Sequence, residues 1–213
     1  MEKRKNQFNK AWMQEHVSDH YVQEARRLGY RARAAFKLLE IDAKDSLLHP
    51  GAVIVDLGSA PGSWSQVAAA KLHGKGQVVA LDLLPMDPVP GVTFIQGDFT
   101  ESAVLEALER TLAGRRVDLV LSDMSPNLSG VASVDQARGV LLAELALEFA
   151  GKWLKPQGAF LVKIFQGEGF DGFRRQMQDV FGSVSVRKPR ASRDRSSEVY
   201  LFAKGRKPEK RSE

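Results

Sequence analysis

The chain contains no cysteine, which excludes disulfide bonds and thiolate metal sites and is typical of a reducing compartment. Its four histidines are scattered without the spacing of a metal-binding motif, so we expect no metal centre. No apolar run approaches the length of a membrane span, and no apolar stretch follows the polar residues 1–6 as it would in a signal peptide. These absences favour a cytoplasmic protein that binds neither a membrane nor a metal.

The size of the chain is that of one globular domain. At 213 residues it is long enough to bury a full core and too short for two large domains. The sequence contains no internal repeat and no interdomain linker, and nothing in it suggests an obligate dimer, so we expect a monomer. We expect a basic extension over residues 1–30, one domain over residues 31–205 and a basic tail over residues 206–213.

The net charge of +5 is distributed unevenly along the chain. Residues 1–37 carry nine Lys and Arg against four Asp and Glu, and residues 187–213 carry ten against four. The stretch between them carries 12 against 18, so an acidic body has two basic ends. This distribution favours an enzyme that binds nucleic acid. We expect phosphate contacts from the segment 187–195 and from Arg26, Arg27, Arg31 and Arg33, whereas the last ten residues could equally serve solubility alone.

Strand and helix signals alternate along the chain with short connections, which predicts a doubly wound, mostly parallel sheet with helices on both faces. Several of the strand candidates are apolar throughout, as strands covered on both faces are. The strand candidates are residues 53–57, 77–83, 92–96, 117–122, 159–165, 183–187 and 199–203. The helix candidates are residues 32–41, 63–72, 101–112, 134–153 and 170–180.

Prolines and glycines refine this prediction. Pro156-Gln157-Gly158 should end the long helix and turn the chain into the next strand, and Pro85, Pro88 and Pro90 argue against a helix after the second strand. The last two of the seven strands have no long helix between them. This α/β pattern is typical of the single-domain class I (Rossmann-like) methyltransferases, whose ligands lie at the carboxyl ends of the strands.

The most informative stretch runs from Asp56 to Trp64. An apolar strand ends at Asp56, small residues and glycines follow, and a helix begins near Trp64, so bare backbone amides face a ligand at a helix N-terminus. Ala60 and Pro61 occupy the loop, so the turn is not the GxGxxG phosphate motif, and no Lys-Ser or Lys-Thr pair completes a P-loop. An acid beside such a turn suits a ligand with an amino group and no phosphates, such as S-adenosylmethionine.

Acidic residues follow the other strands in the same way. Asp82 stands where a ribose-binding acid belongs, Asp98 is placed to receive an adenine edge, and Asp123 follows the fourth strand. Adenosyl compounds offer hydroxyl, amino and ammonium donors, which carboxylates accept. Any one aspartate is readily explained as a turn former, but that explanation is poor for the whole set.

Charged residues also occur where burial makes them costly. Lys163 lies inside the apolar run 160–165, Glu198 opens the last strand, and Lys37 lies on the helix before the first strand. Asp123 can pair with Lys163 if the fourth and fifth strands are neighbours. The alternative for Lys163 is a lysine whose ammonium reaches solvent from an edge strand.

These residues resemble the FtsJ-type ribosomal RNA 2′-O-methyltransferases, a family of heat-shock enzymes that act on the large ribosomal subunit of bacteria. The resemblance covers most of the chain, from about residue 20 to residue 204. The segments that carry it are residues 29–38, 56–64, 122–127, 162–167 and 192–204.

The resemblance implies a catalytic tetrad of two lysines and two acids, which is far more specific than the glycine turn. It also implies S-adenosylmethionine as the cofactor, Lys163 as the proton acceptor, and a uridine ribose of 23S ribosomal RNA in the assembled 50S subunit as the substrate. The tetrad would be Lys37, Asp123, Lys163 and Glu198. The cofactor contacts would be Gly62, Trp64, Asp82, Asp98 and Asp123.

The chemistry can be argued without the family. A sulfonium methyl is already activated, so an enzyme must align a ribose oxygen with it and manage one proton. A neutral Lys163 would accept that proton, whereas a charged Lys163 would orient the hydroxyl and stabilise negative charge on oxygen. A nearby Lys37 cation would favour the neutral form of Lys163, whereas the carboxylates of Asp123 and Glu198 would favour the charged form. The sequence is therefore compatible with both roles.

Three other functions share part of this pattern. A 2′-O-methyltransferase of transfer RNA or of a messenger cap would carry the same tetrad, although the short chain favours ribosomal RNA. A non-catalytic RNA-binding or ribosome-assembly factor would be expected to have lost the tetrad or the glycine turn. A nicotinamide dehydrogenase would need the third glycine of its fingerprint, which is missing.

Overall fold

The structure is a computed structural model that describes residues 19–127, 129–193 and 196–208. Residues 1–18 of the expected basic extension and residues 209–213 of the expected tail therefore lie outside the described residues. None of the described helices is long and apolar enough to cross a membrane.

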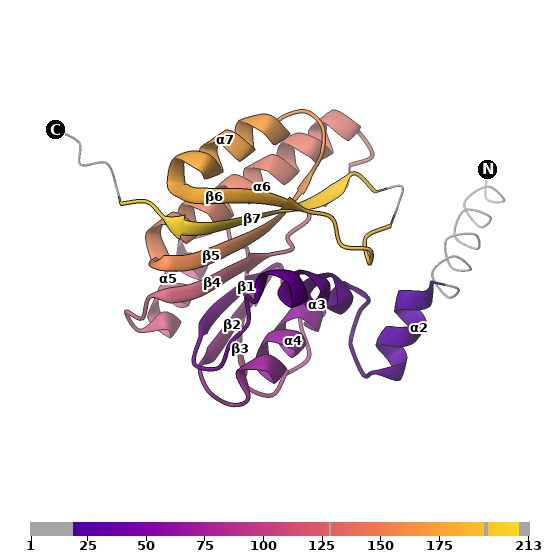
Figure 1. Cartoon of the computed structure of the whole chain (residues 1–213), viewed down its shortest axis with the longest axis vertical. Helices are drawn as coiled ribbons and strands as arrows, with labels where there is room; N and C mark the ends of the chain where they lie inside the picture. The colour runs from indigo at the N-terminus through magenta and orange to yellow at the C-terminus, as the bar shows by residue number, and fades with distance from the viewer. Residues whose placement is uncertain (1–18, 128, 194–195, 209–213) are drawn as a thin grey trace.

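The centre of the molecule is one sheet of seven strands in the order β3-β2-β1-β4-β5-β7-β6 (Figure 1). The first five strands in this order, β3, β2, β1, β4 and β5, are parallel to one another. Strand β7 is antiparallel to both β5 and β6. This arrangement confirms the mostly parallel α/β sheet that the alternation of strand and helix signals predicts. The strands are β1 Val53–Leu57, β2 Gln77–Asp82, β3 Val92–Gln96, β4 Val117–Ser122, β5 Leu154–Phe165, β6 Phe181–Arg187 and β7 Glu198–Arg206.

Helices cover both faces of the sheet. Three of them, α5 Ser102–Leu112, α6 Ala132–Trp153 and α7 Phe170–Val180, pack on one face and bury one apolar core. Helices α3 Ala34–Asp45 and α4 Ser63–Leu72 pack on the opposite face and bury a second core. Figure 1 shows α6 and α7 on one side of the strands and α3 and α4 on the other.

Alternation along the strands decides which side chains enter which core. Val53, Val55 and Leu57 of β1 face the α5–α7 side, whereas Ile54 faces α3 and α4. All five residues of β1 are buried, as the uninterrupted apolar run predicts for a strand covered on both faces. The central strands are therefore fixed in position, and so are the residues at their ends.

Most predicted element bounds agree with the structure within three residues, but β5 begins earlier than expected. The strand includes Pro156 and Gly158, which had been interpreted as a turn, because Leu154 already pairs with Val117 of β4. The register between the two strands shifts after that pair, and this irregularity accommodates the extra residues.

One helix was not expected from the sequence. Helix α2, His20–Arg27, lies within the extension predicted for residues 1–30, beside α3 (Figure 1). The side chain of Asp19 caps it by accepting a hydrogen bond of 3.0 Å from the backbone N–H of Tyr21. The three prolines after β2 were interpreted correctly, since residues 83–91 contain no helix.

Candidate active site

The four residues expected to form the tetrad converge at the end of the sheet where the parallel strands have their carboxyl ends. Lys37 Nζ lies 2.6 Å from Glu198 Oε1. Lys163 Nζ lies 3.1 Å from Asp123 Oδ1 and donates a hydrogen bond of 2.6 Å to the backbone carbonyl of the same aspartate. Two amines and two carboxylates that are far apart in the sequence thus form two adjacent ion pairs.

Tyr200, which was not among the predicted site residues, joins these two ion pairs into one cluster. Its hydroxyl donates to Asp123 Oδ1 at 2.9 Å and lies 3.4 Å from Glu198 Oε1. Lys37 Nζ donates to the same hydroxyl oxygen at 3.3 Å. A signal was available, because residues two apart on a strand share a face and Glu198 is two residues before Tyr200.

The sheet register explains why these side chains meet. In the antiparallel pairing of β5 with β7, Lys163 is opposite Tyr200. Both belong to the face that α3 covers, and α3 carries Lys37. Because β7 runs against its neighbours, its first residue, Glu198, lies at the edge where the parallel strands end. Asp123 follows the last residue of β4 at that edge.

The cluster is largely withdrawn from solvent. The side chain of Lys163 is 6% exposed, and those of Lys37 and Glu198 are 13% and 12% exposed. Burial, followed by the charges of Asp123 and Glu198, raises the pKa of Tyr200 well above its ordinary value. The Tyr200 hydroxyl therefore stays protonated and acts as a fixed hydrogen-bond donor.

The glycine turn between β1 and α4 lies directly beside this cluster. Gly58 has a φ of +75°, and a Cβ atom there would lie 2.7 Å from the backbone of Met124, the residue after Asp123. Gly62, the N-cap of α4, has a φ of +104°, which favours glycine. The turn can approach the end of β4 because Gly58 has no side chain.

The carboxylates expected to bind the cofactor shape the loops at the ends of β2 and β3. Asp82 accepts hydrogen bonds of 2.8 Å from the backbone amides of Ala60 and Leu84, so it ties the glycine turn to the end of β2. Asp98 accepts from the backbone N–H and the hydroxyl of Thr100. These two bonds lower the pKa of Asp98.

Asp56 is the most deeply buried carboxyl group at this edge. Its Oδ2 accepts a hydrogen bond of 2.7 Å from the Ser65 hydroxyl, whereas its Oδ1 has no partner within the described chain. Burial is the main cause that raises the pKa of Asp56 to about 7, and the charges of Asp123 and Asp82 add to it. The turn therefore covers a buried oxygen that can still take a hydrogen bond.

Trp64 is a wall of the site rather than an open binding surface. Its side chain is buried, its Nε1 donates 2.8 Å to the carbonyl of Ala34, and its ring packs at 5.6 Å against Tyr200. The indole therefore connects α4 to α3 beneath the tetrad.

The basic segments differ in how their charges are used. Two of the four arginines expected to contact phosphates have their guanidinium groups engaged inside the protein. Arg31 donates to three backbone carbonyls, and Arg33 binds Asp19 and the carbonyl of Ala191. Arg187 forms a bidentate ion pair with Asp45, in which Nε donates to Oδ2 at 2.6 Å and Nη2 donates to Oδ1 at 2.7 Å.

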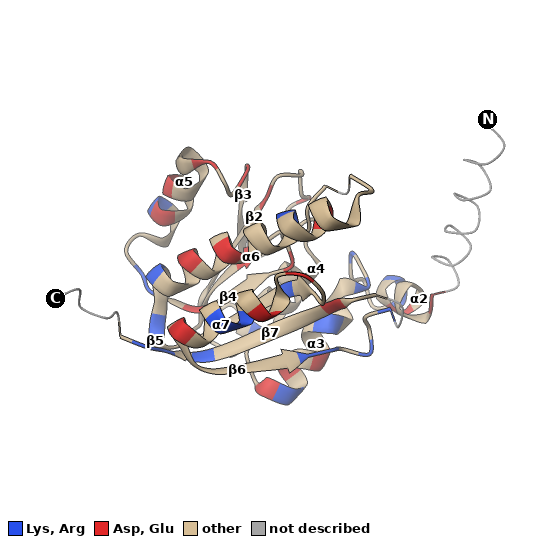
Figure 2. Cartoon of the chain, turned by 90° about the horizontal axis from the view of Figure 1, so that it is seen from above, with Lys and Arg blue, Asp and Glu red and all other residues tan. Residues whose placement is uncertain are grey.

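Exposed positive charge remains nearby. Arg26, Arg27, Lys188 and Arg190 are exposed, and blue ribbon marks α2 and the chain between β6 and β7 in Figure 2. Arg27 pairs with Glu24 at the surface, and Lys188 Nζ donates to the carbonyls of Ser196 and Glu198. Arg195 lies outside the described residues.

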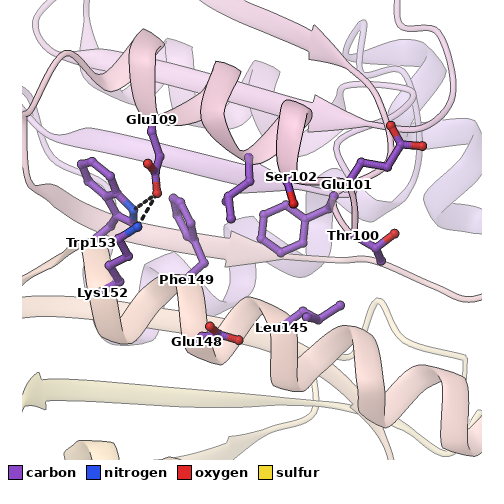
Figure 3. Close-up of a pocket in the computed structure, with 11 residues that line it drawn as sticks. Thr100, Glu101, Ser102, Glu109, Leu145, Glu148, Phe149, Lys152 and Trp153 are labelled. Atoms are coloured by element: carbon purple, nitrogen blue, oxygen red, sulfur yellow. Dashed lines mark hydrogen bonds and ion pairs between the residues drawn. The ribbon is translucent and has the colours of Figure 1, made fainter.

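A groove lies between α5 and α6, on the face of the sheet opposite to α3. Figure 3 shows the residues that line it. Glu109 occupies one side of it and binds Lys152 at 2.6 Å and the indole of Trp153 at 3.2 Å. None of the residues that line the groove belongs to the predicted site. Within the described ranges, no group of three His, Asp or Glu side chains is arranged to hold a metal ion.

Comparison with known proteins places the chain in a family. The family model of the FtsJ-like methyltransferases matches residues 30–206. A protein of Azoarcus sp. (strain BH72) named ribosomal RNA large subunit methyltransferase E is 68% identical over 199 residues, which cover 93% of this chain and 97% of that one. A protein of the same name from Methylobacillus flagellatus is 63% identical and covers 91% and 94%.

Solved structures support the fold. A Plasmodium falciparum protein described as a ribosomal RNA methyltransferase superposes with a TM-score of 0.75 at 29% identity, over 83% of this chain and 98% of that one. Fibrillarin of Aeropyrum pernix, solved with natively bound S-adenosyl-L-methionine, gives a TM-score of 0.54 over 82% and 75% of the two chains. At 16% identity this second likeness concerns the fold alone. The resemblance inferred from the sequence is thus confirmed, and the chain belongs to the FtsJ-like methyltransferase family.

Proposed function

We propose that this protein transfers a methyl group from S-adenosylmethionine to the ribose 2′-hydroxyl of a uridine in 23S ribosomal RNA. The observation that carries the proposal is the convergence of Lys37, Asp123, Lys163 and Glu198 beside the glycine turn. Eight relatives that are 56–68% identical are named ribosomal RNA large subunit methyltransferase E, which supports this substrate class.

The residues around the turn fit the cofactor. The glycines leave the backbone bare, Asp56 Oδ1 is a buried acceptor without a partner in the described chain, and the other acids follow adjacent strands. An adenosyl ligand with a positively charged methionyl end matches such a set of acceptors. We assign its binding to Gly62, Trp64, Asp82, Asp98 and Asp123.

When bound, S-adenosylmethionine would supply a methyl carbon on a positively charged sulfur, and the carbon–sulfur bond would break as the ribose oxygen bonds to that carbon. The protein has to hold the ribose oxygen in line and remove its proton. Lys163 forms an ion pair at rest, so it would first have to give up one ammonium proton. The neutral amine then has two N–H groups and one lone pair. The carbonyl and the carboxylate of Asp123 occupy the two N–H groups, so the lone pair is directed elsewhere and can take the 2′-hydroxyl proton.

Asp123 then stabilises the ammonium that Lys163 becomes. The Tyr200 hydroxyl donates a hydrogen bond to the same carboxylate and holds that carboxylate in one orientation. Lys37 and Glu198 neutralise each other and fix the other side of the tyrosine hydroxyl. In this scheme Lys163 is the proton acceptor, and the other four groups orient it and balance its charge.

The exposed basic residues on α2 and between β6 and β7 are assigned to the RNA backbone. Such contacts give salt-dependent affinity without sequence preference, so the choice of one uridine rests on RNA shape and an accessible loop. Raising the salt concentration should therefore weaken RNA binding steeply and S-adenosylmethionine binding little. Equal salt sensitivity of the two would contradict this division of roles.

The proposal extends to the assembled 50S subunit as the substrate particle. It further includes action as a monomer in the cytoplasm, with a methyltransferase domain at residues 31–205. The deciding experiment is methyl transfer from radiolabelled S-adenosylmethionine to 50S particles, free 23S RNA and transfer RNA. We expect label in the 50S particles, at a ribose. Preferential labelling of transfer RNA would favour the alternative 2′-O-methyltransferase function, and no transfer to any RNA would favour a non-catalytic assembly factor.

A further inference from the structure

Arg31 makes an unusual set of contacts for a residue in a basic, RNA-facing arm. Its Nη1 donates to the carbonyls of Pro61 at 2.9 Å and Asp87 at 2.6 Å, and its Nη2 donates to the carbonyl of Pro88 at 2.7 Å. The guanidinium group therefore bridges two loops. One is the glycine turn, and the other is the proline-rich connection after β2.

The backbone around Arg31 is fixed as well. Its N–H donates to the Gln66 side-chain carbonyl at 2.9 Å, and the Gln66 amide donates to the carbonyl of Gly29 at 3.1 Å. Gln66 lies on α4, the helix that the glycine turn opens. Both the main chain and the side chain of Arg31 are thus tied to the elements that form the proposed cofactor pocket.

Gly62 shows how closely the guanidinium group approaches the turn. A Cβ atom on Gly62 would lie 2.8 Å from Arg31 Nη1 and 2.8 Å from the sulfur of Met86. Met86 belongs to the proline-rich connection that Arg31 holds. The arginine head therefore packs against the position where only a glycine fits, between the turn and this connection.

A planar guanidinium group suits this place and an ammonium does not. Three carbonyls from separate peptide units are met by donors in a fixed fork, which a lysine on a flexible stem cannot reproduce at once. Residues 83–91 contain no helix or strand, so their position depends on contacts of this kind.

We infer that Arg31 is a positioning residue of the cofactor pocket and not a phosphate contact. It holds the connection 86–88 against the glycine turn so that the loop after Asp82 is shaped before the cofactor binds. This inference rests on the proposed function, because it concerns the pocket assigned there to S-adenosylmethionine. It also makes the basic arm part of the cofactor pocket as well as a neighbour of the RNA surface.

The test compares full-length Arg31→Ala and Arg31→Lys with the wild type. For Arg31→Ala we expect the KM for S-adenosylmethionine to rise about tenfold or more, since several hydrogen bonds that shape the pocket are lost. The kcat at saturating cofactor should stay within about threefold, and the dependence of RNA affinity on salt should keep its slope, because no phosphate contact is removed. Arg31→Lys should behave like the alanine variant, with a KM at least about threefold raised.

Two controls make the result specific. Arg26→Ala removes an exposed arginine of α2 and should weaken RNA binding and lower its salt slope, with the KM for S-adenosylmethionine unchanged. Arg110→Ala, on an exposed face of α5, should change neither quantity.

The inference is overturned if Arg31→Ala keeps the KM of the wild type while its salt slope falls as in Arg26→Ala. Should the alanine variant not fold, Arg31→Lys decides alone, and an unchanged KM in that variant overturns the inference. Failure of the proposed function would look different, because the wild type itself would then bind no S-adenosylmethionine.

Discussion

Strands β4 and β5 carry a lysine–aspartate pair near each of their two ends, and the two pairs have different surroundings. Near the glycine turn, Lys163 lies 3.1 Å from Asp123 and its side chain is 6% exposed. At the opposite end, Lys155 lies 2.8 Å from Asp118 and its side chain is 44% exposed. Asp118 also accepts a hydrogen bond from the backbone N–H of Val53, so it belongs to the framework of the sheet.

The two pairs teach that an ion pair on neighbouring strands is not in itself a mark of catalysis. An exposed pair contributes at most about 1 kcal/mol and is screened by salt. The buried pair is joined through Tyr200 to a second ion pair and lies against the glycine turn. What distinguishes it is a closed set of partners that fixes each donor and acceptor.

The largest effect should come from Lys163→Ala compared with Lys155→Ala. Loss of the proposed proton acceptor should reduce methyl transfer about a thousandfold or more, while S-adenosylmethionine binding stays within a few-fold. Lys155→Ala should keep its rate, because that lysine lies at the far end of the strand. Single-turnover transfer and calorimetric binding measure the two quantities. Near-normal turnover of Lys163→Ala would remove this residue from the mechanism.

The second comparison is between Asp123→Asn and Asp118→Asn. The first leaves the buried Lys163 without its counter-charge, so we expect about a hundredfold slower transfer, weaker cofactor binding, and a stability loss on the order of 3 kcal/mol. Asp118→Asn breaks a pair whose lysine is exposed and keeps a side-chain oxygen for the Val53 amide, so it should cost about 1 kcal/mol. Denaturant unfolding together with transfer assays checks both. Equal losses of stability would show that the two pairs are energetically alike.

Tyr200→Phe isolates the link between the two ion pairs. The ring and its packing against Trp64 are kept, but the carboxylate of Asp123 loses a donor. We expect about tenfold slower transfer, equivalent to one lost hydrogen bond, with the KM for S-adenosylmethionine within twofold. Tyr21→Phe is the matched control, because that hydroxyl bonds to Glu40 outside the cluster. An unaltered kcat for Tyr200→Phe would mean that the two pairs act independently.

Asp56 differs from Asp123 and Asp118 because it is a buried carboxyl group with no lysine among its described partners. Its pKa is raised to about 7, so between pH 4 and pH 7 the unfolded chain releases this proton while the folded chain keeps it. Stability therefore falls with rising pH through that window. Asp56→Asn should remove the loss and raise the Tm at pH 8 by roughly 5 °C.

The control for Asp56→Asn is the same measurement at pH 4. There the two forms should differ little, because the wild-type carboxyl group is protonated in the folded chain and only partly ionised in the unfolded chain. A lower Tm for Asp56→Asn at pH 8 would indicate that the ionised carboxylate is stabilised by a partner. Asp123→Asn, which loses a counter-charge, should shift the Tm at pH 8 in the opposite direction.

Much of the fold was predictable because the central strands are apolar on both faces. The bounds of β1, β3 and β4 agree with prediction, and so do those of α4 and α7. The start of β5 was missed because Pro156 and Gly158 indicate a turn locally, whereas pairing with β4 overrides that preference. Helix α2 was missed because it is short and consists mostly of polar residues, so only the cap at Asp19 indicated it.

The site was predictable in part. Strand ends indicated the acids, but the tetrad itself came from the family resemblance, because Lys37 and Glu198 meet only when α3 packs on the face of β7. Tyr200 was missed since its hydroxyl gains its partners only through the pairing of β5 with β7. The role of Arg31 was also not predictable from charge, because its carbonyl partners are backbone groups that no sequence pattern marks.

The reversed direction of β7 has a consequence for how such a protein can change. A one-residue insertion between Glu198 and Tyr200 would swing one of them to the opposite face, because side chains alternate along a strand. An insertion ahead of the strand, between Arg187 and Ser192, leaves that alternation intact. A change of length in the loop 188–191 therefore leaves Glu198 and Tyr200 on the same face of β7, so this loop can vary without rearranging the tetrad.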